Sequence, residues 1–286
     1  MSVSAGASTP TQPPLSTEVR RASSKRRVTV RAYLRELWAR KELIRVLAGR
    51  ELKSQYEMNV IGFAWWLAEP LTLTAVYTMV VFILGASQPA YPLFVLCALL
   101  PFKWLSSGLV GSMGTVRSNG SLVTDVYFPR ALLPLVEVVV GLAHFLIGLA
   151  IVPLFMIAYQ VAPSINLLWV PVIMLVQFLF ILAFAYPMSV LGLHYRNLQN
   201  LSGNILRLWF YLAPGIWSLS QINSETLREL VKLNPLSGLF LSYRAAILEG
   251  RAPGWELAYT LGIGLVVLVL GFRFYIRREA QFGKLV

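Results

Sequence analysis

Five ionisable side chains lie inside long apolar stretches, where a charge is costly and marks a functional site by default. They are Glu69, Lys103, Glu137, His144 and Arg207. Lys103 follows Pro101 and precedes Trp104, so it could line a conduit and meet a diphosphate, or it could snorkel or pair with a carboxylate. Glu69, Glu137 and His144 could form a proton relay, or the two glutamates, near their helix starts, could be structural.

Aromatic side chains near the same stretches could stack on sugar rings, because aromatic faces suit apolar sugar faces. With Lys103, the candidates for lining a conduit are Trp65, Trp104, Tyr211 and Trp217. Packing inside a helix bundle, or an interfacial belt of aromatics, explains any one of them equally well.

Several kinds of chemistry lack the residues they need. Cys97 is the single cysteine, so we expect neither an intrachain disulfide nor a cysteine metal cluster. No G-x-x-x-x-G-K-[ST] motif occurs, so no P-loop holds nucleotide phosphates. One aspartate, Asp125, and no paired carboxylates argue against a glycosyltransferase. We therefore expect a chain that is not an enzyme, with no catalytic, cofactor-binding or metal-binding residues.

The composition indicates a membrane protein. The chain is 57% hydrophobic and 13% charged, with a mean hydropathy of +0.64, whereas soluble domains carry about 25% charged residues. Several windows stay apolar for about 20 residues, enough for a helix to cross a bilayer. We expect an all-α polytopic protein whose transmembrane domain covers residues 59–286. Its six predicted spans are Val60–Leu84, Pro92–Gly114 interrupted at 101–104, Ala131–Tyr159, Leu167–Leu193, Leu201–Leu219 and Leu257–Ile276.

Basic residues set the expected orientation, because Lys and Arg accumulate in short cytoplasmic loops. Residues 1–58 hold twelve of them, whereas 85–91 and 160–166 carry no charge. Both termini are therefore predicted to be cytoplasmic, in a multi-pass protein of the cytoplasmic membrane. Residues 1–30 read as a disordered basic tail. Beside membrane spans, such a tail indicates anionic lipid rather than nucleic acid.

Three further segments have distinct patterns. Residues 31–58 predict an amphipathic helix along the membrane face. Residues 115–130 predict a cytoplasmic loop that displays Tyr127 and Phe128, either for docking a protein or as part of the aromatic belt. In 220–256, a charged helical stretch, Asn-Pro and a short apolar run predict a re-entrant external gate. The gate candidates are Asn234, Pro235, Tyr243 and Arg244.

Two motifs resemble signatures of one protein family. They are "RELKSQYEMNVIGFAWWLAEP" (Arg50–Pro70) and "SLVTDVYFPRALLPL" (Ser121–Leu135). Both are similar to motifs in the membrane subunits of type 2 ABC exporters that move lipid-linked polysaccharides, namely O antigens, teichoic acids and cell-wall galactans. "YRNL" (195–198), "WFYLAPGIW" (209–217) and "NPLSGLFLSYR" (234–244) also fit that family. Asp125 stands where the family commonly has lysine, and Glu51 where it has aspartate.

The resemblance implies a permease that assembles as a homodimer with two copies of an ABC nucleotide-binding subunit. That partner would bind ATP and Mg, and the cargo would be a polyprenyl-diphosphate-linked glycan. The loop would contain a coupling helix that seats in the ATPase, with Ser121, Leu122, Asp125, Tyr127, Phe128 and Arg130 as coupling residues. The amphipathic helix, with Arg50, Lys53 and Tyr56, would brace the same ATPase.

Two alternative functions remain open from the sequence. An ABC exporter of a drug or small lipid shares the fold, and fold-level analogy does not settle the substrate. A secondary transporter could use the embedded carboxylates and His144 for proton coupling.

Overall fold

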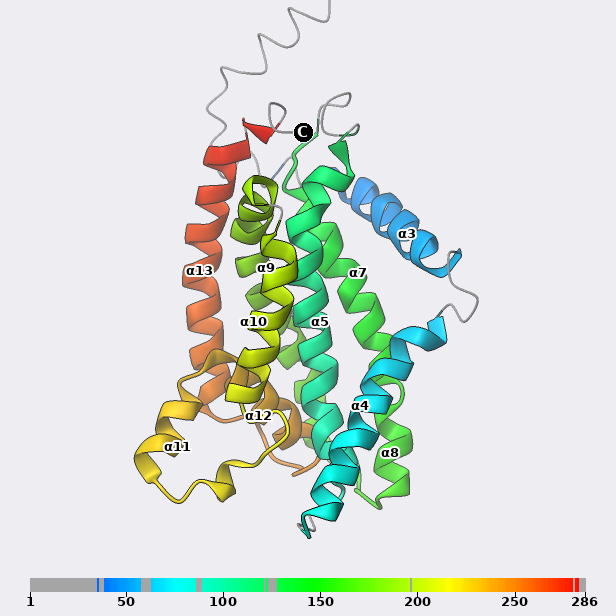
Figure 1. Ribbon diagram of the computed structural model, residues 1–286, viewed down its shortest axis with the longest axis vertical. Helices are drawn as coiled ribbons and strands as arrows, with labels where there is room; N and C mark the ends of the chain where they lie inside the picture. The colour runs from blue at the N-terminus through cyan, green and yellow to red at the C-terminus, as the bar shows by residue number, and fades with distance from the viewer. Residues whose placement is uncertain are drawn as a thin grey trace, which may run out of the picture.

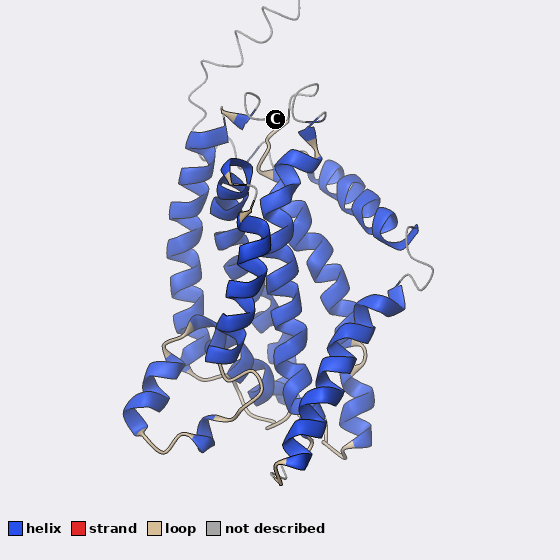
Figure 2. Cartoon of the chain, viewed as in Figure 1, coloured by secondary structure: helices blue, strands red, loops and turns tan. Residues whose placement is uncertain are grey.

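The computed structural model describes residues 39–57, 63–85, 89–120, 128–195, 197–279 and 281–282, with the single positions 35 and 122. Within these residues all regular structure is helical, which confirms the predicted fold class (Figure 2). Five helical segments there are long and apolar enough to cross a membrane. They are Trp66–Ile83, Tyr91–Ser118, Leu132–Ala158, Ile165–His194 and Trp255–Glu279.

Helix α5 (Tyr91–Ser118) is the centre of the bundle. It packs against α4 (Phe63–Ile83), α7 (Leu132–Leu149), α9 (Val170–His194) and α10 (Leu198–Leu212). Helix α13 (Trp255–Glu279) packs along α9 on the side away from α4 (Figure 1). The membrane-length part of α5 is 72% buried, whereas that of α4 is only 11% buried. Helix α4 therefore leaves most of its apolar surface uncovered in a single protomer.

The two ends of the bundle carry different elements. At one end, called here the α3 end, lie α3 (Lys41–Glu57) and the last turn of α13. The opposite end, the α12 end, carries α11 (Glu225–Lys232) and α12 (Pro235–Ile247) (Figure 1). Helix α12 is almost wholly buried against α13, α5 and α9, so it is part of the bundle.

The bounds of the predicted spans need two corrections. The expected interruption at 101–104 is wrong, because α5 continues through Pro101. Proline is tolerated in membrane helices, and at this turn Gln177 Nε2 of α9 donates to the carbonyl of Pro101 at 2.8 Å, which attaches α5 to α9. The third predicted span is confirmed as one candidate span, Leu132–Ala158, in which two residues separate α7, ending at Leu149, from α8 (Val152–Ala158).

The fifth predicted span is shorter than expected. Helix α10 has 15 residues, or about 22 Å at 1.5 Å per residue, less than a bilayer core. It ends at Leu212, just before Pro214, because a proline disfavours helical geometry in the residue before it. The described structure thus confirms five spans by length and does not confirm the sixth.

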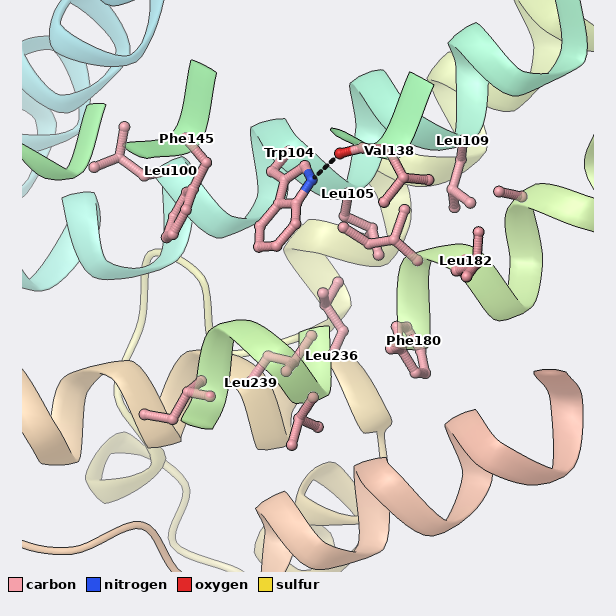
Figure 3. Packing of buried hydrophobic residues seen from close by; sticks show 14 of the residues in the cluster. Leu100, Trp104, Leu105, Leu109, Val138, Phe145, Phe180, Leu182, Leu236 and Leu239 are labelled. Atoms are coloured by element: carbon pink, nitrogen blue, oxygen red, sulfur yellow. Dashed lines mark hydrogen bonds between the residues drawn. The ribbon is translucent and has the colours of Figure 1, made fainter. Parts of the chain in front are cut away.

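Aromatic and aliphatic side chains fill the core between α5, α7, α9 and α12 (Figure 3). Small residues let the helices approach closely, as is usual in membranes. A Cβ added at Gly192 of α9 would lie 2.3 Å from the carbonyl oxygen of Met113 in α5. One added at Gly271 of α13 would lie 2.8 Å from the carbonyl oxygen of Ala183 in α9. Helices α5, α9 and α13 therefore form one tightly packed unit.

Candidate functional site

Lys103 of α5 is paired across to α4. Its ammonium donates to the carboxylate of Glu69 and, at 3.3 Å, to the carbonyl of Trp66. It also lies 5.1 Å from the centre of the Trp66 ring. Of the alternatives that the sequence left open, the structure shows pairing with a carboxylate. The Glu69 side chain is 62% exposed and that of Lys103 18%, so the pair opens to the outside of the protomer.

A second polar contact joins α4 to α10. The hydroxyls of Tyr77 and Tyr211 lie 2.9 Å apart, and Trp217 Nε1 donates to the carbonyl of Tyr211 at 3.0 Å. Tyr211 remains 46% exposed. Tyr77 follows Glu69 by eight residues, about 12 Å along a helix.

We call Glu69, Lys103, Tyr77, Tyr211 and Trp217 the conduit face. Its residues belong to α4, α5, the C-terminal end of α10 and the loop after it, which contains Trp217, and α4 and α10 lie on either side of α5 (Figure 1). A carboxylate exposed at membrane depth is costly against lipid and normally faces a bundle interior or water. The conduit face therefore does not suit contact with hydrocarbon.

The prediction that Trp104 lines a conduit is wrong. Its side chain is fully buried, with Nε1 donating to the carbonyl of Val138 at 3.1 Å (Figure 3). Its ring stacks on Phe145 at 5.1 Å between centroids. Gly141 of α7 makes room for this ring, because an added Cβ there would lie 2.7 Å from the indole. The side chain of Trp65 lies outside the described residues.

The other embedded ionisable groups are dispersed. Glu137 of α7 lies close to Thr115 of α5. His144 stacks on Trp66 with 5.1 Å between ring centroids, and Arg207 is exposed on α10. Glu69 pairs with Lys103, whereas Glu137 lies close to Thr115, so the two carboxylates have different neighbours.

The α3 end contains the end of the predicted coupling loop. Ser121, Asp125 and Tyr127 lie outside the described residues, and Leu122 packs against the core. The expectation that Phe128 is displayed to solvent is wrong, since its side chain is only 4% exposed. Phe128 belongs to the core cluster, and two residues later Arg130 contacts the end of α13.

Arg130 and Glu279 join the segment before α7 to the last turn of α13. The Glu279 carboxylate accepts from the backbone N–H of Arg130 at 2.8 Å, immediately before α7. The Arg130 guanidinium donates to the backbone carbonyl of Glu279 at 2.8 Å, in the last turn of α13. Unpaired N–H groups at helix starts favour a negative charge, and unpaired carbonyls at helix ends favour a positive one. Arg117 similarly donates to the carbonyl of Leu193 at the end of α9, at 3.0 Å.

Helix α3 matches the predicted amphipathic segment over the part that is described. Ala48 packs on Val136 and Val140 of α7, while Arg50 and Lys53 are exposed on the other side. Its charged face is therefore available at the α3 end. The side chain of Tyr56 lies outside the described residues.

The gate candidates prove to be buried connections. Tyr243 and Arg244 are each 1% exposed, so neither lines an open passage in this structure. The Arg244 guanidinium donates to the carbonyls of Phe94, Pro214 and Gly215 and lies 3.4 Å from the Phe94 ring centroid.

Half-buried Asn234 caps α12 by accepting from the N–H of Leu236 at 3.1 Å, next to half-buried Pro235. It also accepts from Trp209 Nε1 at 2.9 Å, which ties α12 to α10. Tyr243 donates to Gln177 Oε1 at 2.9 Å. Sequence reasoning missed Gln177 and the bonding of Arg244, although an arginine in an apolar run and a Pro-Gly pair upstream were visible signals.

These features define a class: a polytopic helical membrane protein with a polar face at membrane depth and an anchored loop at one end. The sequence profile of the ABC-2 type transporter family matches residues 42–248. The chain therefore belongs to the ABC-2 type transporter family.

Relatives of known name cover nearly the same length. An O-antigen export system permease protein of Myxococcus xanthus is 33% identical over 238 residues, 82% of this chain and 92% of that protein. One of Klebsiella pneumoniae is 25% identical over 247 residues, 86% and 95% of the two chains. A polysialic acid transport protein of Escherichia coli is 23% identical over 252 residues, 84% and 94% of the two chains.

Proposed function

We propose that this chain is the permease subunit of an ATP-driven exporter that moves a lipid-linked polysaccharide across the cytoplasmic membrane. The observation that carries the proposal is the 33% identity to an O-antigen export permease over 82% of this chain. The resemblance of its motifs to polysaccharide exporters points the same way. ATP and Mg belong to a separate nucleotide-binding subunit, because the sequence holds no P-loop.

The working unit is two copies of this chain with two nucleotide-binding subunits. Helix α4 supports the dimer, because it leaves Met79, Phe82 and Ile83 at least 63% exposed beside the conduit face. Pairing two such faces shelters Glu69 and Lys103 from lipid and forms a path between the copies. The diphosphate and sugars of a polyprenyl-linked glycan suit the ammonium, hydroxyl and aromatic groups found there.

The α3 end faces the cytoplasm in this proposal. It carries the basic residues of α3 and of the last turn of α13, as the positive-inside rule requires. The loop 115–130 then docks the ATPase, and the α12 end faces outward. Single cysteines at Gln88 and Ser121 check the orientation: an impermeant thiol reagent added outside reaches 88 and not 121. Labelling only at 121 would reverse the topology.

Deletion of the gene tests the function in its native setting. The surface loses its polysaccharide and the polyprenyl-diphosphate-linked glycan accumulates inside, while sensitivity to lipophilic drugs stays the same. A plasmid copy of the chain restores the surface glycan. An unchanged surface with raised drug sensitivity would instead identify the drug exporter that the sequence left open.

A further inference from the structure

Helix α13 is held at both of its ends by specific polar contacts. At the α3 end, Glu279 and Arg130 are joined by two hydrogen bonds of 2.8 Å, each between a side chain and a backbone group. At the α12 end, Thr260 Oγ1 lies 3.0 Å from the carbonyl of Pro235, the first residue of α12. The two attachments are 19 residues apart, about 28 Å along a helix. A single helix thus connects the end of the loop 115–130 to α12.

The attachment at the α12 end leaves no room for sliding. A Cβ added at Gly238 would lie 2.3 Å from Thr260 Oγ1 and 2.6 Å from the carbonyl oxygen of Glu256. Such a close approach means that the start of α12 follows the adjacent turn of α13. Arg244 and Tyr243 hold the rest of α12 to α5, α9 and the loop after α10.

The attachment at the α3 end also resists movement. Beside the Arg130–Glu279 contact, Phe128, Tyr275 and Phe282 belong to the buried core cluster. Tyr275 and Phe282 meet edge to face with centroids 5.3 Å apart. A displacement of the loop must therefore either carry the end of α13 with it or break this contact.

We infer that the Arg130–Glu279 contact is the joint through which movement of the loop 115–130 is passed to α13 and along it to α12. This rests on the proposed function, in which the ATPase moves that loop. Arg130 and Glu279 are positioning residues here. Coupling between distant sites needs an element with two arrangements that both sites bias, and this inference assigns that part to the unit of α13 and α12.

The contact pairs each side chain with a backbone group, which gives it a distinctive signature. The N–H at 130 requires an acceptor from position 279, and the carbonyl at 279 requires a donor from position 130. Exchanging the two side chains places a carboxylate against the carbonyl and a guanidinium against the N–H. The double variant Arg130→Glu/Glu279→Arg therefore stays defective, whereas a simple side-chain ion pair would be restored.

The experiment follows the exposure of α12 with a thiol at position 237. Ser237 is fully buried in α12, and its Oγ has no hydrogen-bond partner among the described residues, so Ser237→Cys costs little. The complex with the nucleotide-binding subunit is placed in lipid nanodiscs in a Cys97→Ala background. The rate of labelling by a polar maleimide is measured with and without ATP and vanadate. The nucleotide is expected to raise the rate in this parent protein.

Glu279→Ala and Arg130→Ala are expected to reduce that increase at least about five-fold, the lower end of usual coupling factors. In Glu279→Ala, which lies outside the docking loop, binding of the ATPase and its basal hydrolysis stay at the parent level. Glu279→Gln keeps an acceptor oxygen and the side-chain size, so it shows a smaller loss and guards against a folding defect. Gly262→Ala is the matched control, because nothing lies within 4 Å of an added Cβ there.

The outcomes separate this inference from the proposed function. A parent complex that does not form defeats both. The inference about the Arg130–Glu279 contact alone fails if the parent shows the nucleotide-dependent rise in labelling and the alanine variants show the same rise. It also fails if the charge-exchanged double variant regains that rise. If Gly262→Ala reduces the nucleotide-dependent increase in labelling as much as Glu279→Ala does, this also counts against the inference, because any change to α13 would then have the same effect.

Discussion

Lys103 and Glu69 form an ion pair between α5 and α4 at membrane depth, with the carboxylate turned to the outside of the protomer. The pair explains how two charged residues are held in spans that are otherwise apolar. In the proposed dimer, this is the side of the protomer that we expect a polar cargo to meet.

Removing one member of the pair should harm the protein more than removing both. Lys103→Met leaves the Glu69 carboxylate without its ammonium at membrane depth, and Glu69→Gln leaves the ammonium. We expect each single variant to melt lower than the double variant Lys103→Met/Glu69→Gln, because an uncompensated charge costs more than a missing pair. Fluorescence-detected size exclusion after heating measures this order. A double variant that melts lower than both single variants would contradict it.

The two tryptophans separate packing from a conduit role. Trp104→Ala removes a fully buried ring and its hydrogen bond to Val138, so it should destabilise the fold by about 3–5 kcal/mol. Trp217→Ala, at the conduit face, should keep the melting temperature within a few degrees of the wild-type value. It should lower export of the glycan. Surface polysaccharide normalised to folded permease is the readout. Equal melting temperatures for the two variants would refute the assignment of Trp104 to packing and of Trp217 to the conduit face.

Arg244 should tolerate no replacement. Its planar guanidinium reaches three carbonyls at once, and a lysine ammonium cannot reproduce that fork. Arg244→Lys is expected to lower stability, and Arg244→Met to cost about 2–4 kcal/mol because several buried carbonyls lose charged donors. Arg251→Lys is the control, since Arg251 is exposed after α12. If Arg244→Lys melts at the wild-type temperature, the three guanidinium–carbonyl hydrogen bonds contribute little to stability.

Tyr127 is a better residue than Phe128 for testing ATPase docking, because Phe128 is buried. Phe128→Ala empties a core position, so its effect on docking is confounded with folding. If Tyr127 is an interface hot spot, Tyr127→Ala should weaken binding of the ATPase by about 2 kcal/mol or more. Less ATPase should then co-purify with the permease. The permease itself should insert and dimerise normally. Undiminished co-purification and normal export would leave Tyr127 as a member of the interfacial aromatic belt.

The spans were predictable because a continuous stretch of about twenty apolar residues is typical of a helix that crosses a bilayer. The positions of α4, α5, α9 and α13 follow the predicted segments within a few residues. Local signals failed where tertiary partners decide the outcome. Pro101 marks a break in sequence terms, but the helix continues through it, packed against α9.

The same limit applies to single side chains. Trp104, Phe128 and Arg244 have side-chain types that suit an exposed site, yet all three are buried. The partners of two of them are 34 and 150 positions away in the sequence, namely Val138 for Trp104 and Phe94 for Arg244. Composition and spacing carry no information about such distant partners, whereas the Lys103–Glu69 pairing was one of the alternatives that the sequence suggested.

The central claim is that ATP hydrolysed by a separate subunit drives a lipid-linked glycan through this permease. The most direct measurement places the purified chain in liposomes with its nucleotide-binding subunit and follows the appearance of a polyprenyl-diphosphate-linked glycan in the opposite leaflet. We predict translocation that requires ATP and the partner, with no ATP turnover by the chain alone. Translocation driven by a proton gradient without ATP, or hydrolysis by the chain alone, would contradict the account.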